Sequence, residues 1–482
     1  MTIKVLVLFL LVLGLSFYAW KDWFRSLCGL ILLMAVLERT DMPKSMFGVQ
    51  GMNPWNMLFI MIVIAWAAAR RREGLVWDMP SYVSALLVMY LLVVLVGFVR
   101  AVLDRSYLEN YSLTNQISDQ LINTIKWVLP GLLVFDGCRT RSRVVMILVC
   151  VPLVYLLIAV QVIKHMPLDA VLGQSGRLDS LRMRLGGDVG YSAADLSVML
   201  AGVPWGMLAA LPLVRQRKYR VMLLAAAGVV TLGQVLTGGR AGYIAWGAIG
   251  VVLCLMKWPR YLILAPVFLV LASVLFPGAV SRMRQGFGTI DVDGQATVDK
   301  RAATTGRAVI WPLVIEKIGE SPWIGYGCSA MRRTGLARQI ESDEIETSFY
   351  HPHNMYLESL LDNGVLGSLP IFLFWGSAVI YSACLFRCDN RLYSAVGGLS
   401  LVLTLASLIG GISGQHFYPQ EHTLGIWAAF FLTLRVRVEE KRARVMVFPA
   451  EGMPGVPWVA RQRQPVPSMG NASLAAEPFR RD

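Results

Sequence analysis

Long apolar runs constrain this chain more than any other feature of its sequence. A helix needs about 20 apolar residues to cross a hydrocarbon core, and thirteen runs reach or approach that length. They cover residues 3–20, 24–37, 54–69, 80–103, 121–137, 144–164, 191–213, 221–237, 241–256, 260–277, 354–386, 393–414 and 422–435. Because hydrocarbon offers the backbone no hydrogen-bond partners, each run must satisfy its own N–H and C=O groups as a helix. We therefore predict an all-α integral membrane protein with about 12–13 transmembrane helices.

The composition agrees with this prediction. Hydrophobic residues make up 56% of the chain and charged residues only 16%, against about 25% charged in soluble domains. The net charge of +14 raises the question of nucleic acid. However, the basic residues gather in short clusters between apolar runs, which is typical of cytoplasmic loops. We expect no nucleic-acid binding.

The basic clusters also predict the orientation. They lie at 70–72, 139–143, 215–220, 257–260, 387–391 and 435–444. All six fall on one side if the chain crosses thirteen times, and the positive-inside rule assigns that side to the cytoplasm. This places the N-terminus outside and the C-terminus inside.

Four regions follow from this topology. Residues 1–277 hold the N-terminal transmembrane helices, 278–353 a large outer loop, and 354–435 the C-terminal transmembrane helices. The Pro-, Gly- and Ala-containing stretch 436–482 is expected to be a disordered cytoplasmic tail. Within the loop, apolar residues at helical spacing predict an amphipathic helix from about 306 to 319. Structured loops of this length are usually functional.

The strongest candidate for chemistry is the sequence His351-Pro352-His353-Asn354, where the large loop re-enters the membrane. A neutral imidazole can accept a proton from a hydroxyl near physiological pH. Tyr356 lies three residues beyond His353 and is expected on the same helix surface. The alternative interpretation is a histidine that only caps or anchors the helix. Two histidines beside Asn354 in the one large outer loop favour a functional role.

Two arginines form the second candidate group. Arg240 lies in the turn Thr237-Gly238-Gly239-Arg240 on the predicted outer side, where it breaks the basic-inside pattern, and Arg307 opens the amphipathic helix. A guanidinium near hydrocarbon is costly unless it has a partner, and paired arginines suit a pyrophosphate. A snorkelling arginine is the alternative for Arg240. Arg184 is a weaker candidate, because a solvated loop of mixed charge also explains it.

Other chemistries lack support in the sequence. The seven cysteines show no metal-ligand spacing, and only Cys328 falls in an outer loop, so neither a metal site nor a disulfide is expected. No Gly-rich nucleotide-binding motif and no transmembrane acidic relay occurs. We expect no cofactor.

These features together resemble the O-antigen ligase superfamily. The resemblance rests on about a dozen helices, a long outer loop in the C-terminal third, and His353-Asn354 followed after nine residues by Gly364-Val365-Leu366-Gly367. It is best over about 235–370. The superfamily includes O-antigen ligases, some O-antigen polymerases and O-linking protein oligosaccharyltransferases.

The resemblance implies a GT-C-like, inverting, metal-independent glycosyltransferase of the bacterial inner membrane that acts in lipopolysaccharide or polysaccharide biosynthesis. The donor would be a glycan on undecaprenyl pyrophosphate, and the periplasmic acceptor a hydroxyl of lipid A core, a glycan or a protein. Arg240, Arg307 and His353 would be catalytic. Asn354, His351, Tyr356 and Arg184 would bind substrate. A glycolipid transporter is the alternative of a different class, which predicts two halves with broken helices; no such halves are evident in the sequence.

Overall fold

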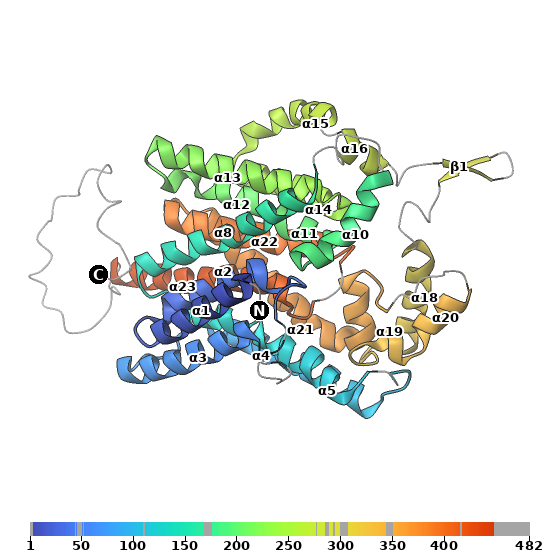
Figure 1. The fold of residues 1–482 in the computed structure, drawn as a ribbon, viewed down its shortest axis with the longest axis horizontal. Helices are drawn as coiled ribbons and strands as arrows, with labels where there is room; N and C mark the ends of the chain where they lie inside the picture. The colour runs from blue at the N-terminus through green and yellow to red at the C-terminus, as the bar shows by residue number, and fades with distance from the viewer. Residues whose placement is uncertain are drawn as a thin grey trace, which may run out of the picture.

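The structure is a computed structural model of the chain, and it is an elongated array of packed helices (Figure 1). It describes residues 3–43, 45, 51, 53–108, 111–167, 176–275, 277–284, 289–292, 295–298, 307–343, 350–414 and 417–447. All structural statements below refer to these residues.

The first half of the chain begins with four apolar helices and continues through a broken segment. The helices are α1 (Ile3–Ala19), α2 (Trp23–Leu37), α3 (Pro54–Glu73), α4 (Ser81–Leu103), α5 (Leu113–Gln116), the π-helix η1 (Ile117–Ile122), α6 (Asn123–Lys126), α7 (Leu129–Gly137), α8 (Arg141–His165), α10 (Gly176–Val189), α11 (Ala193–Ala201), α12 (Val203–Ala210) and the 3-10 helix η2 (Leu211–Leu213).

The second half contains the large loop and the last three long helices. Its elements are α13 (Arg217–Leu236), α14 (Arg240–Lys257), the 3-10 helix η3 (Pro259–Leu264), α15 (Ala265–Leu275), α16 (Pro277–Arg284), β1 (Thr289–Val292), β2 (Gln295–Val298), α18 (Arg307–Glu320), α19 (Ala330–Arg333), α20 (Leu336–Asp343), α21 (Met355–Phe386), α22 (Arg391–Gly410), η5 (Glu421–Thr423) and α23 (Leu424–Val447).

Seven of the described helical segments are long and apolar enough to cross a membrane, and two shorter apolar helices, α1 and α2, accompany them. The seven are Ser81–Leu103, Arg141–His165, Ala193–Leu213, Arg217–Leu236, Arg240–Lys257, Met355–Phe386 and Arg391–Gly410. All thirteen predicted apolar runs fall on helical segments of the structure. The remaining runs form shorter or interrupted helices, or, as in α3 and α23, helices that end in charged residues. The chain is thus an all-α, multi-pass membrane protein, as the sequence predicts.

The basic clusters meet at one end of the array, which we call the basic end. Arg70 in the last turn of α3 pairs with the buried Asp136 at 2.5 Å. Lys257, at the end of α14, donates to the carbonyl of Phe386 at 2.9 Å, at the end of α21. Contacts of this kind between segments far apart in the sequence show that the predicted basic side is one surface of the molecule.

Helix α23 continues twelve residues beyond the predicted boundary at 435. Arg435 is fully buried, and it bonds to Asp78 through both terminal nitrogens and to Glu439 one turn later. Arg442 reaches the same Asp78 at 2.7 Å. This ionic network stabilises α23 beyond residue 435, where the charged sequence had predicted the start of a disordered tail. The rest of the predicted tail, 448–482, lies outside the described residues.

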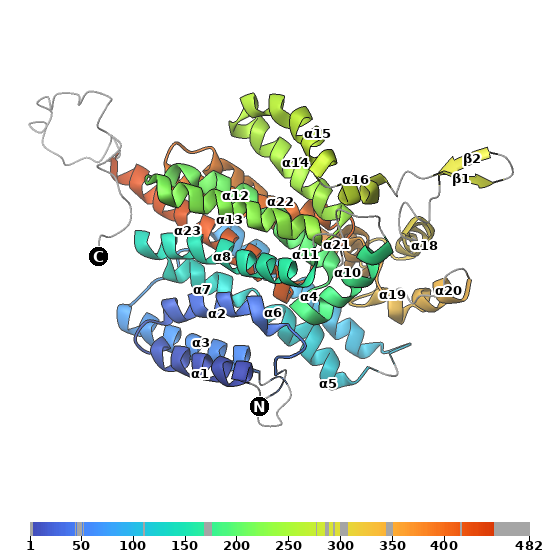
Figure 2. The same ribbon diagram turned by 45° about the horizontal axis from the view of Figure 1, so that its top comes forward.

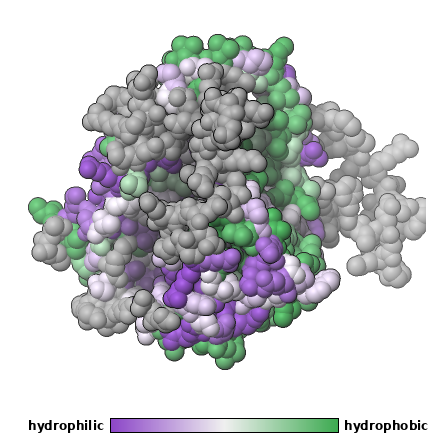
Figure 3. Space-filling view, turned by 90° about the vertical axis from the view of Figure 1, so that its right-hand side faces the viewer, coloured by the Kyte–Doolittle hydropathy of each residue, from purple (hydrophilic) through white to green (hydrophobic). Residues whose placement is uncertain are grey.

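The large loop lies at the opposite end, which we call the loop end (Figures 1 and 2). The predicted amphipathic helix is present as α18, with Ile310 and Val314 buried in a small separate core that also includes Leu361 of α21. The loop also contains a hairpin that the sequence analysis did not predict, in which β1 pairs antiparallel with β2. Seen from this end, hydrophilic side chains gather in the lower half of the face, and hydrophobic ones line its upper and right margins (Figure 3).

Candidate active site

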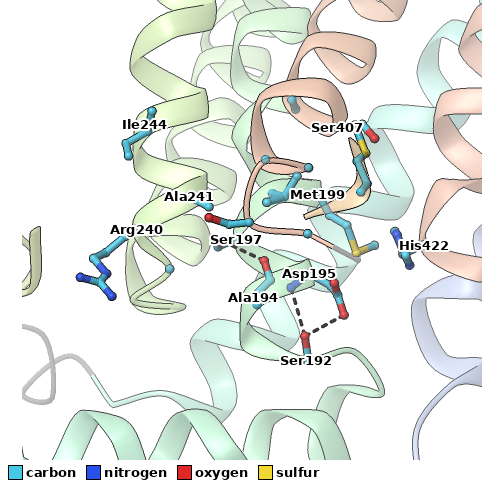
Figure 4. Close-up of a pocket in the computed structure, with 18 of the residues that line it drawn as sticks. Ser192, Ala194, Asp195, Ser197, Met199, Arg240, Ala241, Ile244, Ser407 and His422 are labelled. Atoms are coloured by element: carbon cyan, nitrogen blue, oxygen red, sulfur yellow. Dashed lines mark hydrogen bonds between the residues drawn. The ribbon is translucent and has the colours of Figure 1, made fainter. Parts of the chain in front are cut away.

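A cavity of about 840 Å³ opens at the loop end, where several helices begin. The first residues of α14 and α18 line it, and the residues that precede and open α11 and α21 line it too. Figure 4 shows part of this lining. The polar and charged side chains that line the cavity are Tyr155, Arg182, Ser192, Asp195, Ser197, Arg240, Arg307, His353, Ser407, Ser413 and His422. Most of the remaining lining is apolar or glycine.

Arg240 is the first residue of α14 and follows a tight turn. The hydroxyl of Thr237 closes that turn by donating to the Gln234 carbonyl at 2.7 Å. Glycine is required at 239 and 242, where a Cβ would come within 2.3 Å of Ser197 on α11. The two glycines therefore allow close packing of α14 on α11. No side chain caps the start of α14, so its positive end adds to the field of Arg240.

Arg307 is the first residue of α18 and is half-buried. Its terminal nitrogens donate to the Ser413 hydroxyl at 3.2 Å and to the Ser413 carbonyl at 3.4 Å. Burial, and then the nearby charge of Arg240, lowers the pKa of Arg307 below its usual value. An arginine nonetheless stays protonated. Two cations are thus close enough to repel each other, and an anion bound between them would relieve that repulsion.

His353 lies in the turn that precedes α21, with a left-handed backbone (φ 50°) that is uncommon for a residue other than glycine. Its ring meets that of His351 edge-on, with 4.1 Å between the centroids. Between them, the carbonyl of Pro352 accepts a hydrogen bond from the indole of Trp311 at 3.1 Å. Trp311 belongs to α18, so this bond ties the histidine turn to the helix that carries Arg307.

The structure places the four predicted substrate-binding residues outside the lining of the cavity. The Asn354 side chain accepts from the amides of Tyr356 and Leu357 and caps α21. The Tyr356 hydroxyl donates to the Leu408 carbonyl at 2.8 Å. His351 reaches the cavity only through its ring contact with His353, and Arg184 is exposed on α10.

The sequence patterns did not predict Asp195 or His422, two titratable residues that line the cavity. Arg182 also lines it and lies two residues before Arg184 in the same segment of mixed charge. Asp195 lies three residues after Ser192 at the start of a helix, a spacing that indicates a capping motif. His422 is the first residue of the predicted apolar run 422–435. Neither position carries a local signal for a ligand site.

The geometry supports two kinds of chemistry. The guanidinium groups and the start of α14, which has no side-chain cap, favour a bound anion, and arginine recognises phosphate oxygens through paired hydrogen bonds. An imidazole in the same cavity can accept a proton from a hydroxyl. No group of three or more His, Cys, Asp or Glu side chains with the geometry to hold a metal ion occurs among the described residues. Metal independence itself stays a prediction.

The central region of the chain is similar to known proteins. Residues 222–372 match a family model described as "O-Antigen ligase". This stretch includes Arg240, Arg307 and His353, but not Arg182, Asp195 or His422. A protein of Rickettsia conorii (strain Malish 7) named "Putative polysaccharide ligase" is 25% identical over 207 residues, which are 41% of this chain and 47% of that protein. The chain thus spans about half the length of this curated relative. The central region of the chain, residues 222–372, is thus similar to an O-antigen ligase domain.

Proposed function

We propose that the protein transfers a glycan from undecaprenyl pyrophosphate to an acceptor hydroxyl at the periplasmic face of the bacterial inner membrane. The observation that carries this proposal is that Arg240, Arg307 and His353, which lie far apart in the sequence, all line one cavity at the loop end. This cavity holds cationic groups for a leaving diphosphate and an imidazole for an attacking hydroxyl.

In this proposal, Arg240 and Arg307 bind the pyrophosphate of the donor. Charge builds up on the diphosphate as its bond to the sugar breaks, so both guanidinium groups stabilise the transition state more than the ground state. The burial of Arg307 strengthens this effect, because a partly desolvated cation interacts more strongly with an anion than one in water. The reaction needs no nucleotide hydrolysis, because cleavage of the bond between the sugar and the pyrophosphate of the donor supplies the free energy.

His353 accepts the proton of the acceptor hydroxyl. The hydroxyl oxygen forms a bond to the anomeric carbon, and the bond from that carbon to the phosphate oxygen breaks with its electron pair. The proton moves to the imidazole, and undecaprenyl pyrophosphate leaves. A single displacement of this kind inverts the configuration at the anomeric carbon. These steps describe a GT-C-type reaction in which the chain's own residues supply all the groups.

The orientation of the protein supports a periplasmic reaction. The basic end gathers the clusters that the positive-inside rule assigns to the cytoplasm, and it includes the C-terminal end of the last helix, α23. The cavity lies at the other end, so the C-terminus would be cytoplasmic and the cavity periplasmic. The apolar margins seen in Figure 3 provide the surface along which a polyprenyl chain would lie in the bilayer.

The test is a transfer assay with purified protein in nanodiscs and a fluorescent glycan on undecaprenyl pyrophosphate. Lipid A core oligosaccharide, a free glycan and a serine-containing peptide are offered separately, which distinguishes a ligase, a polymerase and a protein oligosaccharyltransferase. We expect transfer to one of these in the presence of EDTA, with inversion at the anomeric carbon detected by NMR. Arg240→Ala, Arg307→Ala and His353→Ala should each lower kcat/KM about 100-fold or more.

Arg184→Ala serves as the matched control, because Arg184 is an exposed arginine at the same end that does not line the cavity. It should transfer at the wild-type rate. Full activity of the three cavity variants at normal expression would exclude the roles assigned to them. Movement of the donor across sealed vesicles without any transfer would instead support a glycolipid transporter.

A further inference from the structure

Among the described residues that line the cavity, one carries a carboxylate. Asp195 lines it from the first turn of α11. Its Oδ2 accepts a hydrogen bond from the Ser192 hydroxyl at 2.7 Å, and its amide donates to the same hydroxyl at 3.1 Å. Three arginines line the same cavity, yet Asp195 forms no ion pair with any residue in the described part of the chain. The carboxylate is therefore held apart from the guanidinium groups.

His422 lines the same cavity from the short helix η5. Across the described ranges its imidazole makes neither a hydrogen bond nor an ion pair. Figure 4 shows Arg240 and His422 on opposite sides of the cavity, with Asp195 between them. The lining thus has Arg240 on one side, and away from it a second side with the carboxylate of Asp195, the hydroxyl of Ser192 and the imidazole of His422.

The anion-binding role does not account for this second side. A carboxylate repels a diphosphate, so Asp195 would weaken donor binding if the two were adjacent. Carboxylate, hydroxyl and imidazole groups instead form hydrogen bonds with neutral hydroxyls, and a carboxylate acts as a strong acceptor for them. A displacement at the anomeric carbon also requires the attacking hydroxyl to approach from the side opposite the leaving diphosphate.

Helix capping explains only part of the position of Asp195. Ser192 is the N-cap of α11, and Asp195 stands at the third position of the helix, as in a capping box. That contact occupies one carboxylate oxygen, and no residue of the described chain bonds to the other. If Asp195 only capped α11, its side chain would not need to line the cavity that Arg240 also lines.

We infer that Asp195, together with Ser192 and His422, binds the hydroxyl groups of the acceptor across the cavity from the diphosphate. This inference rests on the proposed function and adds to it the site that holds the second substrate. All three residues lie outside the matched region 222–372. The donor side of the cavity therefore comes from the matched region, and this acceptor side from segments on either side of it.

The test separates the two sides of the cavity. Binding of undecaprenyl pyrophosphate without a sugar is measured by thermophoresis in nanodiscs. Transfer is measured as a function of the concentration of whichever of the three acceptors the wild-type protein uses. For Asp195→Asn we expect unchanged lipid binding and about a tenfold rise in KM for the acceptor, the scale of one hydrogen bond to a charged group. His422→Gln should act in the same direction.

Asp195→Asn keeps an oxygen that can accept from Ser192, so the cap of α11 is retained while the charge is lost. Asp195→Glu restores the carboxylate and should recover part of the acceptor affinity. Asp188→Asn is the matched control, since Asp188 is half-exposed at the same end and pairs with His165 outside the cavity. It should leave KM unchanged.

Two results would overturn the inference. One is an acceptor KM in Asp195→Asn equal to that of the wild type, while Arg240→Ala loses lipid binding. The other is an equal loss of lipid binding in Asp195→Asn and Arg240→Ala, which would place Asp195 on the donor side. Absence of transfer by the wild-type protein with all three acceptors would refute the proposed function itself, together with this acceptor site.

Discussion

Gly364 and Trp323 are in direct backbone contact. A Cβ built on Gly364 would lie 2.4 Å from the carbonyl carbon and oxygen of Trp323, and the φ of Gly364 is 61°. Directly after this glycine, the amides of Val365 and Leu366 donate to the carbonyls of Pro322 and Trp323 at 2.8 and 3.0 Å. The segment after α18 is therefore inserted into a break in α21, and the Gly364-Val365-Leu366-Gly367 motif joins the helix that begins at Arg307 to the helix that follows His353.

Replacement of Gly364 should disrupt this junction. In Gly364→Ala, the new methyl group meets backbone rather than a movable side chain. The backbone conformation at this position (φ 61°, ψ −170°), which is almost exclusive to glycine, adds about 1–3 kcal/mol of strain. We expect a lower Tm in detergent and a loss of transfer, because Arg307 and His353 lose their relative placement. Gly376→Ala in the same helix, where a Cβ meets nothing within 4 Å, should keep both. An unchanged Tm and rate in Gly364→Ala would contradict this account of the motif.

Trp311, one turn after Arg307 in α18, should position His353. Trp311→Phe removes the hydrogen bond to the Pro352 carbonyl, worth about 1 kcal/mol, and frees the turn that holds His353 in its left-handed conformation. Transfer should slow about 5- to 10-fold, with little change in the binding of undecaprenyl pyrophosphate. Trp323→Phe, at an exposed tryptophan of the same loop, provides the comparison. A greater effect at Trp323 would refute the positioning role.

Arg307 should not be replaceable by lysine. Arg307→Lys keeps the positive charge but loses the planar pair of donors that spans Ser413 and would span phosphate oxygens. We expect weaker binding of undecaprenyl pyrophosphate and a kcat/KM at least tenfold lower, measured in the nanodisc assays. If the charge alone mattered, the lysine variant would be as active as the wild type, and the paired-donor explanation would be wrong.

Asp78 should govern the stability of the basic end at low pH. Burial alone would raise the pKa of Asp78, but hydrogen bonds and the charge of Arg435 lower it overall. A carboxyl whose folded pKa is lowered stabilises the fold above its unfolded pKa of about 3.9. That contribution is lost as the pH falls from about 4 through the folded pKa.

Asp78→Asn should therefore lower Tm at pH 7 and flatten the dependence of Tm on pH below about 4. Removing one partner of a buried ion pair costs about 3–5 kcal/mol, and Arg435 is fully buried. Glu320→Gln, which breaks an exposed pair with Lys317, should change Tm little. Equal Tm values for Asp78→Asn and the wild type at neutral pH would show that the network does not stabilise the fold.

Local sequence patterns predicted much of this protein. Apolar runs predict helices because a buried or lipid-facing backbone must bond to itself, and all thirteen runs lie on helical segments. The amphipathic stripe predicted α18, since Ile310 and Val314 recur at helical spacing and need a common core. Arg240, Arg307 and His353 could be proposed because each is costly or unusual in its immediate surroundings.

The tertiary structure decided what no local pattern records. Asp78 extends α23 past residue 435 by pairing with Arg435 across 357 positions of sequence. The side chains of Asn354 and Tyr356 bond to backbone atoms and lie outside the cavity. Asp195 and His422 line the cavity, and they belong to helices that are brought together by packing. Which side chains share a cavity depends on close approaches such as that of Gly239 to Ser197. Such contacts join residues that are far apart in the chain. They arise from the packing of helices, and the sequence around either residue does not predict them.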